Sequence, residues 1–265
     1  MDFVVLVGVG LLTGVTTVLF GFGGGFVAVP VVVWADAALG ADAMRVATAT
    51  SALVMVVNAG FATAVTPRRV LRALHGSGRL LLLLAGGAAL GALATRLAPA
   101  GLARWAFVAY VALTIADLLI RPGFLRPGAR GPSVGPRPLP ALFGAPIGAV
   151  AAFLGVGGSV MTVPAMRRAG HPMRVATALA NPLTLAIALP ATAVSLAGTA
   201  VPAAAGDGKQ LVGLVDVGAA AALLLGALPV IAVLRRRPPR IGDRTHARAY
   251  IGLLGVVTVA MLLTG

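Results

Sequence analysis

The chain has 265 residues, of which 59% are hydrophobic and only 11% are charged. Soluble domains carry about 25% charged residues, so this composition excludes an ordinary water-soluble enzyme and favours an integral membrane protein. Cysteine and glutamate are absent and only three histidines are present. Few groups are therefore available for thiolate, acid–base or metal chemistry, and we expect no enzyme activity, no cofactor and no metal site.

The formal net charge is +14, a value that in a soluble protein would suggest nucleic-acid binding. Here nearly all basic residues lie in short gaps between apolar runs, where the loops of membrane proteins carry their positive charge. We therefore expect a lipid bilayer and a small anionic substrate as partners, and no nucleic acid. The sequence gives no prediction of the oligomeric state.

In chain order, apolar runs alternate with short gaps that hold the charges and turn residues. The longest gap, 121–138, is rich in Pro, Gly and Arg, a composition typical of a connector. It divides the chain into a first transmembrane repeat (1–120), a cytoplasmic linker (121–138) and a second transmembrane repeat (139–265). The apolar runs cover residues 3–35, 46–65, 80–97, 102–120, 139–166, 175–200, 211–234 and 249–264.

The two halves share two sequence blocks in the same order. Residues 21–30 align with 155–164 at an offset of 134, and residues 44–49 align with 173–178 at an offset of 129. Gly10 and Gly14 match Gly144 and Gly148 at the first of these offsets. Internal repeats of this kind are typical of membrane transporters.

The first run of each half is too long for one ordinary span. As a single helix, 3–35 would extend about 50 Å, against a hydrocarbon core of about 30 Å, and its glycine cluster at 21–25 favours a break. If both long runs enter the membrane and return, 17 basic residues lie on one side and four on the other, as the positive-inside rule requires.

Each half is thus predicted to be a Gly-broken hairpin followed by three transmembrane helices. Because three is odd, the second half begins on the opposite side, so the topology of the two repeats is inverted. We predict an all-α integral membrane protein with eight to ten membrane segments, cytoplasmic Arg-rich loops and both termini outside. Whether the hairpins are re-entrant or consist of two short full spans stays open.

The glycine clusters are the first candidate site. Non-helical backbone at membrane depth is tolerated where it is buried in protein or lines a wet cavity, and the N-terminus of a broken helix attracts anions. We expect one anion site between the clusters; the alternative is that these glycines only permit close helix packing, the interpretation favoured for the glycines at 10, 14, 144 and 148. The predicted cluster ligands are Gly23, Gly24, Gly25, Gly157, Gly158 and Ser159.

The helix after each hairpin carries a polar stripe. Thr48 and Ser51 in the first half, and Thr177 and Asn181 in the second, are candidate substrate ligands that bury no fixed charge. Pro182 also frees a backbone carbonyl inside its span. The alternative is hydrogen bonding between helices, which is common for such residues in membranes. Asn58 and Thr184 extend the stripes as weaker candidates.

Three charged residues have two interpretations each. Arg45 and Arg174 are repeat equivalents that could attract an anion at opposite mouths, or extend to lipid head groups. Asp117 is the one acid well inside an apolar run and is a possible proton carrier. It lies four residues before Arg121, so an ion pair at a helix end is the alternative.

The doubled pattern G-x3-G-x6-G-x-G-G-[GS], at residues 10–25 and 144–159, resembles that of the sulfite exporter TauE/SafE family, as does the Ala-Thr-Ala-Thr-Ser run at 47–51. The resemblance covers essentially the whole chain. It implies export of small sulfur-containing anions, such as sulfite or organosulfonates, across a bacterial plasma membrane. We expect alternating access around the glycine breaks; the alternatives are an anion channel on the same scaffold and a membrane subunit without transport of its own.

Overall fold

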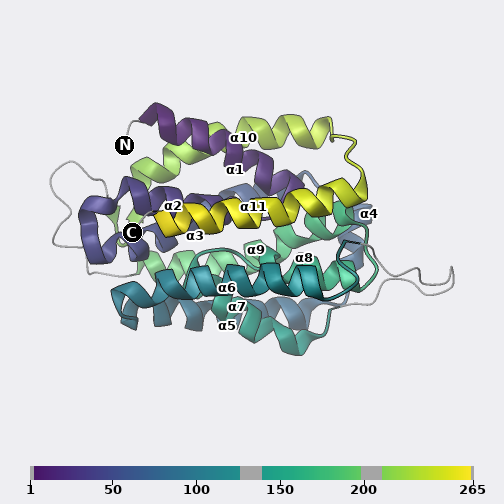
Figure 1. Cartoon of the computed structure of the whole chain (residues 1–265), viewed down its shortest axis with the longest axis horizontal. Coiled ribbons are helices and arrows are strands. Elements are labelled where there is room, and N and C mark those ends of the chain that lie inside the picture. The colour runs from purple at the N-terminus through teal and green to yellow at the C-terminus, as the bar shows by residue number, and fades with distance from the viewer. Residues whose placement is uncertain (1–2, 126–138, 198–210, 264–265) are drawn as a thin grey trace.

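The computed structural model describes residues 3–125, 139–197 and 211–263. Most of the predicted linker, 126–138, lies outside the described residues. The helices run mostly along one direction (Figure 1), and within the described ranges seven of them are long and apolar enough to cross a membrane. The prediction of an all-α integral membrane protein is confirmed.

The first half contains two short connecting 3-10 turns between its helices. Its elements are α1 (Phe3–Phe20), α2 (Gly25–Ala35), η1 (Ala37–Asp42), α3 (Ala43–Ala64), α4 (Arg68–Leu71), η2 (Arg72–Leu74), α5 (Gly78–Leu97) and α6 (Ala100–Ile120).

The second half adds a small antiparallel hairpin before its last two helices. Its elements are η3 (Ala141–Phe143), α7 (Gly144–Leu154), α8 (Ser159–Arg168), α9 (Met173–Leu196), β1 (Leu211–Val212), β2 (Val215–Asp216), α10 (Val217–Arg236) and α11 (Asp243–Leu263).

Both predicted helix breaks are present, one between α1 and α2 and one between α7 and α8. Each is built on left-handed backbone, which glycine adopts without the steric cost that a Cβ brings. The residues concerned are Gly21, Gly23 and Gly24, with φ of 75°, 63° and 87°, and Gly155 and Gly157, both with φ of 69°. The two hairpins differ in the length of their first arm, since α1 has 18 residues whereas α7 has 11.

Glycines outside the breaks bring helix backbones into direct contact. A Cβ added to Gly14 on α1 would lie 2.6 Å from the carbonyl oxygen of Ala227 on α10, and one added to Gly144 on α7 would lie 2.8 Å from that of Leu80 on α5. The α1–α10 and α5–α7 pairs lie at opposite edges of the bundle in Figure 1. Here the packing interpretation of the small-residue pattern is the one that the structure supports.

Two features differ from the apolar runs read off the sequence. The run 211–234 is not one helix, because β1 and β2 precede α10, whose first turn is capped by Asp216 accepting from the Ala219 amide at 2.8 Å. Helix α8 continues past the apolar run to Arg168, so Arg167 and Arg168 are helical rather than loop residues.

Many of the arginines lie in loops and helix ends at one end of the bundle. Helix α4, the start of α9 and the connection from α10 to α11 lie together there, and we call it the arginine-rich end. The ends of the chain labelled N and C in Figure 1 lie at the opposite end. The inverted relation of the two halves, and which end faces the cytoplasm, stay predictions.

Candidate functional site

The two glycine breaks approach each other at the centre of the bundle, against the same two side chains. A Cβ added to Gly23 would lie 2.9 Å from Thr184 Cγ2 and 3.3 Å from Met55 Cγ. One added to Gly157 would lie 2.9 Å from Thr184 Cγ2 and 3.0 Å from Met55 Sδ. Met55 and Thr184 therefore occupy the space between the breaks. Residues 55 and 184 are equivalent at the offset of 129, a signal that could have identified Met55 from the sequence.

Each break packs on the polar stripe of the other half. Gly21 faces the Thr177 carbonyl of α9, since an added Cβ would lie 2.5 Å from that oxygen, and Gly155 faces Thr48 and Ser51 of α3. Ser51 donates a hydrogen bond of 2.9 Å to the Gly155 carbonyl. The structure thus brings the predicted stripe residues to the breaks, in two groups on α3 and α9.

On α9 the polar groups are loosely held. Asn181 Nδ2 lies 3.4 Å from the Thr177 carbonyl oxygen and 3.5 Å from that of Thr17. Thr184 Oγ1 lies 3.5 Å from the Gly21 carbonyl oxygen. These distances are longer than the usual 2.7–3.2 Å. These contacts are therefore weak hydrogen bonds, which hold the side chains of the stripe only loosely.

Several buried polar atoms around the breaks have no hydrogen-bond partner among the described residues. Native proteins pair nearly all such atoms, and leaving one unpaired costs about 1–3 kcal/mol. The unpartnered atoms are Thr48 Oγ1, Ser159 Oγ, Asn181 Oδ1 and both side-chain polar atoms of Asn58. The two hydroxyls and Asn58 Nδ2 can donate to an oxyanion without introducing a buried charge, whereas the two Oδ1 oxygens can only accept.

The remaining predicted break residues are buried beside these groups. A Cβ added to Gly24 would lie 2.8 Å from Asn58 Nδ2, so the absence of a side chain lets the amide approach. Gly25 faces the Met55 side chain, and Gly158 faces the end of Ile187. Ser159 begins α8, and its carbonyl accepts from the Tyr250 hydroxyl at 3.1 Å, which fixes the start of that helix.

Two cavities approach the stripes from opposite ends, and they differ greatly in size. A vestibule of about 470 Å³ at the arginine-rich end is lined in part by Arg174, Thr177 and Ala178. Its counterpart of about 10 Å³ is lined in part by Arg45, Thr48 and Ala49. These are the same three positions of the repeat. Among the described residues, the approach at the arginine-rich end therefore holds a much larger cavity than the equivalent approach at Arg45 and Thr48.

Asp117 lies away from the breaks, near the end of α6. Its carboxylate is 2.6 Å from Arg168 Nη2 and 3.2 Å from Arg121 Nε. The pairing with Arg121 is the one that the spacing suggested, and Arg168 adds a second partner from α8. A proton-carrying role for Asp117 stays a prediction.

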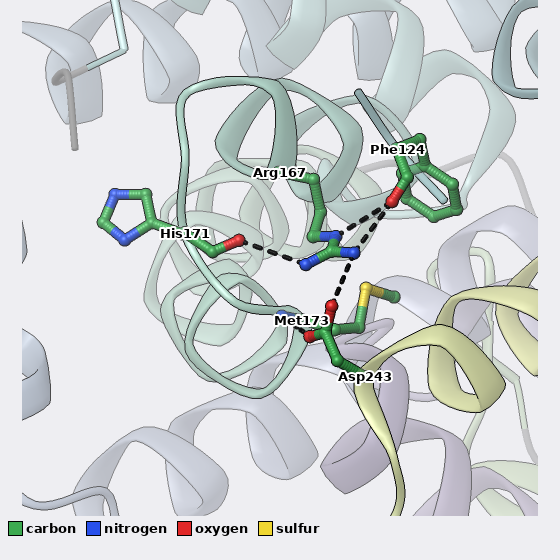
Figure 2. A network of polar contacts seen from close by, with 5 residues as sticks. All are labelled: Phe124, Arg167, His171, Met173 and Asp243. Atoms are coloured by element: carbon green, nitrogen blue, oxygen red, sulfur yellow. Dashed lines mark hydrogen bonds and ion pairs between the residues drawn. The ribbon is translucent and has the colours of Figure 1, made fainter. Parts of the chain in front are cut away.

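A network at the arginine-rich end anchors the second hairpin, as Figure 2 shows. The fully buried Arg167 pairs with Asp243 Oδ2 at 2.8 Å and donates to the Phe124 carbonyl from Nη2 at 2.8 Å. Asp243 Oδ1 also accepts from the Met173 amide at 2.7 Å. His171 belongs to the network through its backbone carbonyl, which accepts from Arg167 Nη1 at 3.4 Å, and burial lowers the pKa of its imidazole, which favours the neutral ring.

The comparisons with known proteins give one match. Residues 6–261 match the family described as Sulfite exporter TauE/SafE. A search of curated proteins and a search of solved structures each return no match.

Proposed function

Because this chain belongs to the sulfite exporter TauE/SafE family, we propose that it is a membrane transporter that exports small anions, with sulfite or an organosulfonate as the leading substrate. The observation that carries the proposal is the vestibule that leads from the arginine-rich end to Thr177, which lies against Gly21 of the first glycine break. Buried hydroxyl and amide groups without partners lie around the breaks, and neutral donors can bind an anion without holding it too tightly for release.

In the proposed mechanism the anion enters the vestibule and passes Thr177 toward the centre. Donors for it would come from the polar groups of α3 and α9 and from the first-turn amides of α2 and α8, which have no partners within their helices. Met55 and Thr184 lie between the breaks and would have to move as the anion passes. The approach at Thr48, closed here, would then open.

The membrane potential is sufficient to drive such export. If the arginine-rich end faces the cytoplasm, as the positive-inside rule predicts, an inside-negative potential of about 100 mV favours exit of a monovalent anion by roughly 2.3 kcal/mol. A coupling ion is therefore not required. A channel on the same scaffold is the less favoured function, because one of the two approaches has a volume of only about 10 Å³.

The test is flux of labelled sulfite into proteoliposomes, with an organosulfonate, thiosulfate and a carboxylate as competitors. We expect saturable uptake without single-channel currents, inhibited by the sulfur oxyanions more strongly than by the carboxylate. Currents of discrete amplitude in a planar bilayer would replace the transporter with a channel. Protein that is correctly inserted but moves none of these anions would leave only a membrane subunit without transport.

A further inference from the structure

The polar lining of the vestibule is dominated by positive charge. Four arginines line it, and no acidic residue is among its lining residues. They come from α4, from the start of α9 and from the end of α10, so the fold brings together charges that are far apart in the sequence. The four are Arg69, Arg174, Arg235 and Arg236.

Arg235 is the most buried of these side chains. It lies in the last turn of α10 and is partly buried, and its Nε and Nη2 atoms are shielded from solvent without a hydrogen-bond partner in the described part of the chain. Arg174 lines the same vestibule, so two like charges share one cavity. Two cations held close together, one with unpaired buried donors, are costly, and a bound anion would offset that cost.

At the opposite approach, the equivalent arginine is paired with a carboxylate. Arg45, the repeat counterpart of Arg174, pairs with Asp42 at 3.0 Å and donates to the Ala98 carbonyl at 3.0 Å. Within the described ranges Arg174 has no carboxylate within 4.0 Å. The charge is thus neutralised at one approach and left available at the other.

We propose that Arg174 and Arg235 form a second anion site, in the vestibule, that captures a small oxyanion from the arginine-rich end before it reaches the breaks. A guanidinium group presents paired donors that match two oxygens of a sulfite, sulfonate or similar group. A cavity lined by charge of one sign also raises the local concentration of the opposite ion. The capture role rests on the proposed transport function, whereas anion binding by the pair does not.

The experiment compares Arg174→Gln and Arg235→Gln with a matched control, Arg237→Gln. Arg237 is exposed, lies two residues beyond Arg235 and does not line the vestibule. Sulfite binding is measured by titration calorimetry on detergent-purified protein, and sulfite KM is measured in proteoliposomes with substrate added at one face at a time. Since the chain has no cysteine, Arg240→Cys, at an exposed position, reports the orientation of the protein in the vesicle through a membrane-impermeant thiol label.

We expect both vestibule variants to weaken sulfite binding and raise KM by about tenfold or more, the loss typical of a charge-assisted hydrogen bond. The change should appear only for sulfite added at the arginine-rich face, and Arg237→Gln should match the wild type. Arg235→Lys keeps the charge and should recover part of the loss. Unaltered elution in size-exclusion chromatography checks that the variants are folded.

Each other outcome has a distinct meaning. Binding and KM unchanged in both vestibule variants would overturn the site. If the variants change sulfite KM in vesicles that contain phosphatidylglycerol but not in vesicles of phosphatidylcholine alone, the two arginines bind a lipid phosphate. That result would also overturn the proposed sulfite site. Wild-type protein that binds sulfite through the pair but transports no anion would keep the site and refute the transport function. Wild-type protein that neither binds nor moves sulfite would refute both.

Discussion

Gly157 and Gly158 are neighbours in the second break, yet alanine should affect them very differently. Gly157 has φ of 69°, and a Cβ there would lie 2.9 Å from Thr184 Cγ2 and 3.0 Å from Met55 Sδ. Gly158 has φ of −78° and ψ of −10°, which any residue adopts. Its added Cβ would lie 2.6 Å from Ile187 Cδ1, the end of a flexible side chain that can rotate away.

The expected loss of stability follows from two contributions, the strain of left-handed backbone and the crowding around the added methyl group. Left-handed backbone costs an alanine about 1–2 kcal/mol, and forcing a methyl group into a packed core adds about 1–3 kcal/mol. Gly157→Ala should therefore lower the free energy of unfolding by at least about 2 kcal/mol, which changes the equilibrium constant for unfolding by a factor of roughly 30. Gly158→Ala keeps only the crowding term, at its lower end.

Two measurements on the purified variants test this reasoning. We expect Gly157→Ala to lower the apparent Tm in detergent by several degrees and to reduce sulfite flux per inserted molecule about tenfold or more, because the strain falls where the breaks meet. Gly158→Ala should lower the apparent Tm less than Gly157→Ala does and should keep sulfite flux close to that of the wild type. If the two variants lose equal amounts of Tm and flux, or if Gly157→Ala behaves like the wild type, the break does not depend on left-handed backbone at this position.

Three further predictions concern other contacts. Ser51→Ala removes the hydrogen bond to the Gly155 carbonyl and should cost about 1 kcal/mol in thermal unfolding; an unchanged Tm would contradict it. Gly148→Ala places a methyl group on the Leu84 carbonyl oxygen and should lower Tm and yield while sulfite KM of the surviving protein stays constant; a changed KM would assign Gly148 to the site. Asp117→Asn breaks the pairs with Arg168 and Arg121 and should reduce stability without altering the pH profile of flux; a flattened profile would identify a proton carrier.

The breaks were predictable because two independent sequence signals agree. The first apolar run is too long for one span, and its glycines allow the chain to reverse. The loop charges then place both hairpins on consistent sides. Such arguments need only periodicity, run length and residue type, which are properties of the chain before it packs.

The centre of the site was harder to predict because it is made by packing between α3 and α9. Met55 has no polar atom to mark it, and only its equivalence to Thr184 at the repeat offset distinguishes it. The burial of Arg167 depends on Asp243 and on the Phe124 carbonyl, partners remote in sequence. Arg235 belongs to a run of arginines, and the sequence does not say which member turns into the vestibule.

The backbone contacts at the edges of the bundle also constrain how the molecule can move. Helix α1 from the first half is locked to α10 from the second, and α7 from the second half is locked to α5 from the first. The halves are consequently interleaved. Neither half can rotate as a rigid body without breaking the contacts between glycines and backbone carbonyls in these two helix pairs. If transport proceeds by the proposed alternating access, these mixed pairs favour a movement whose hinges cut across the repeat boundary instead of following it.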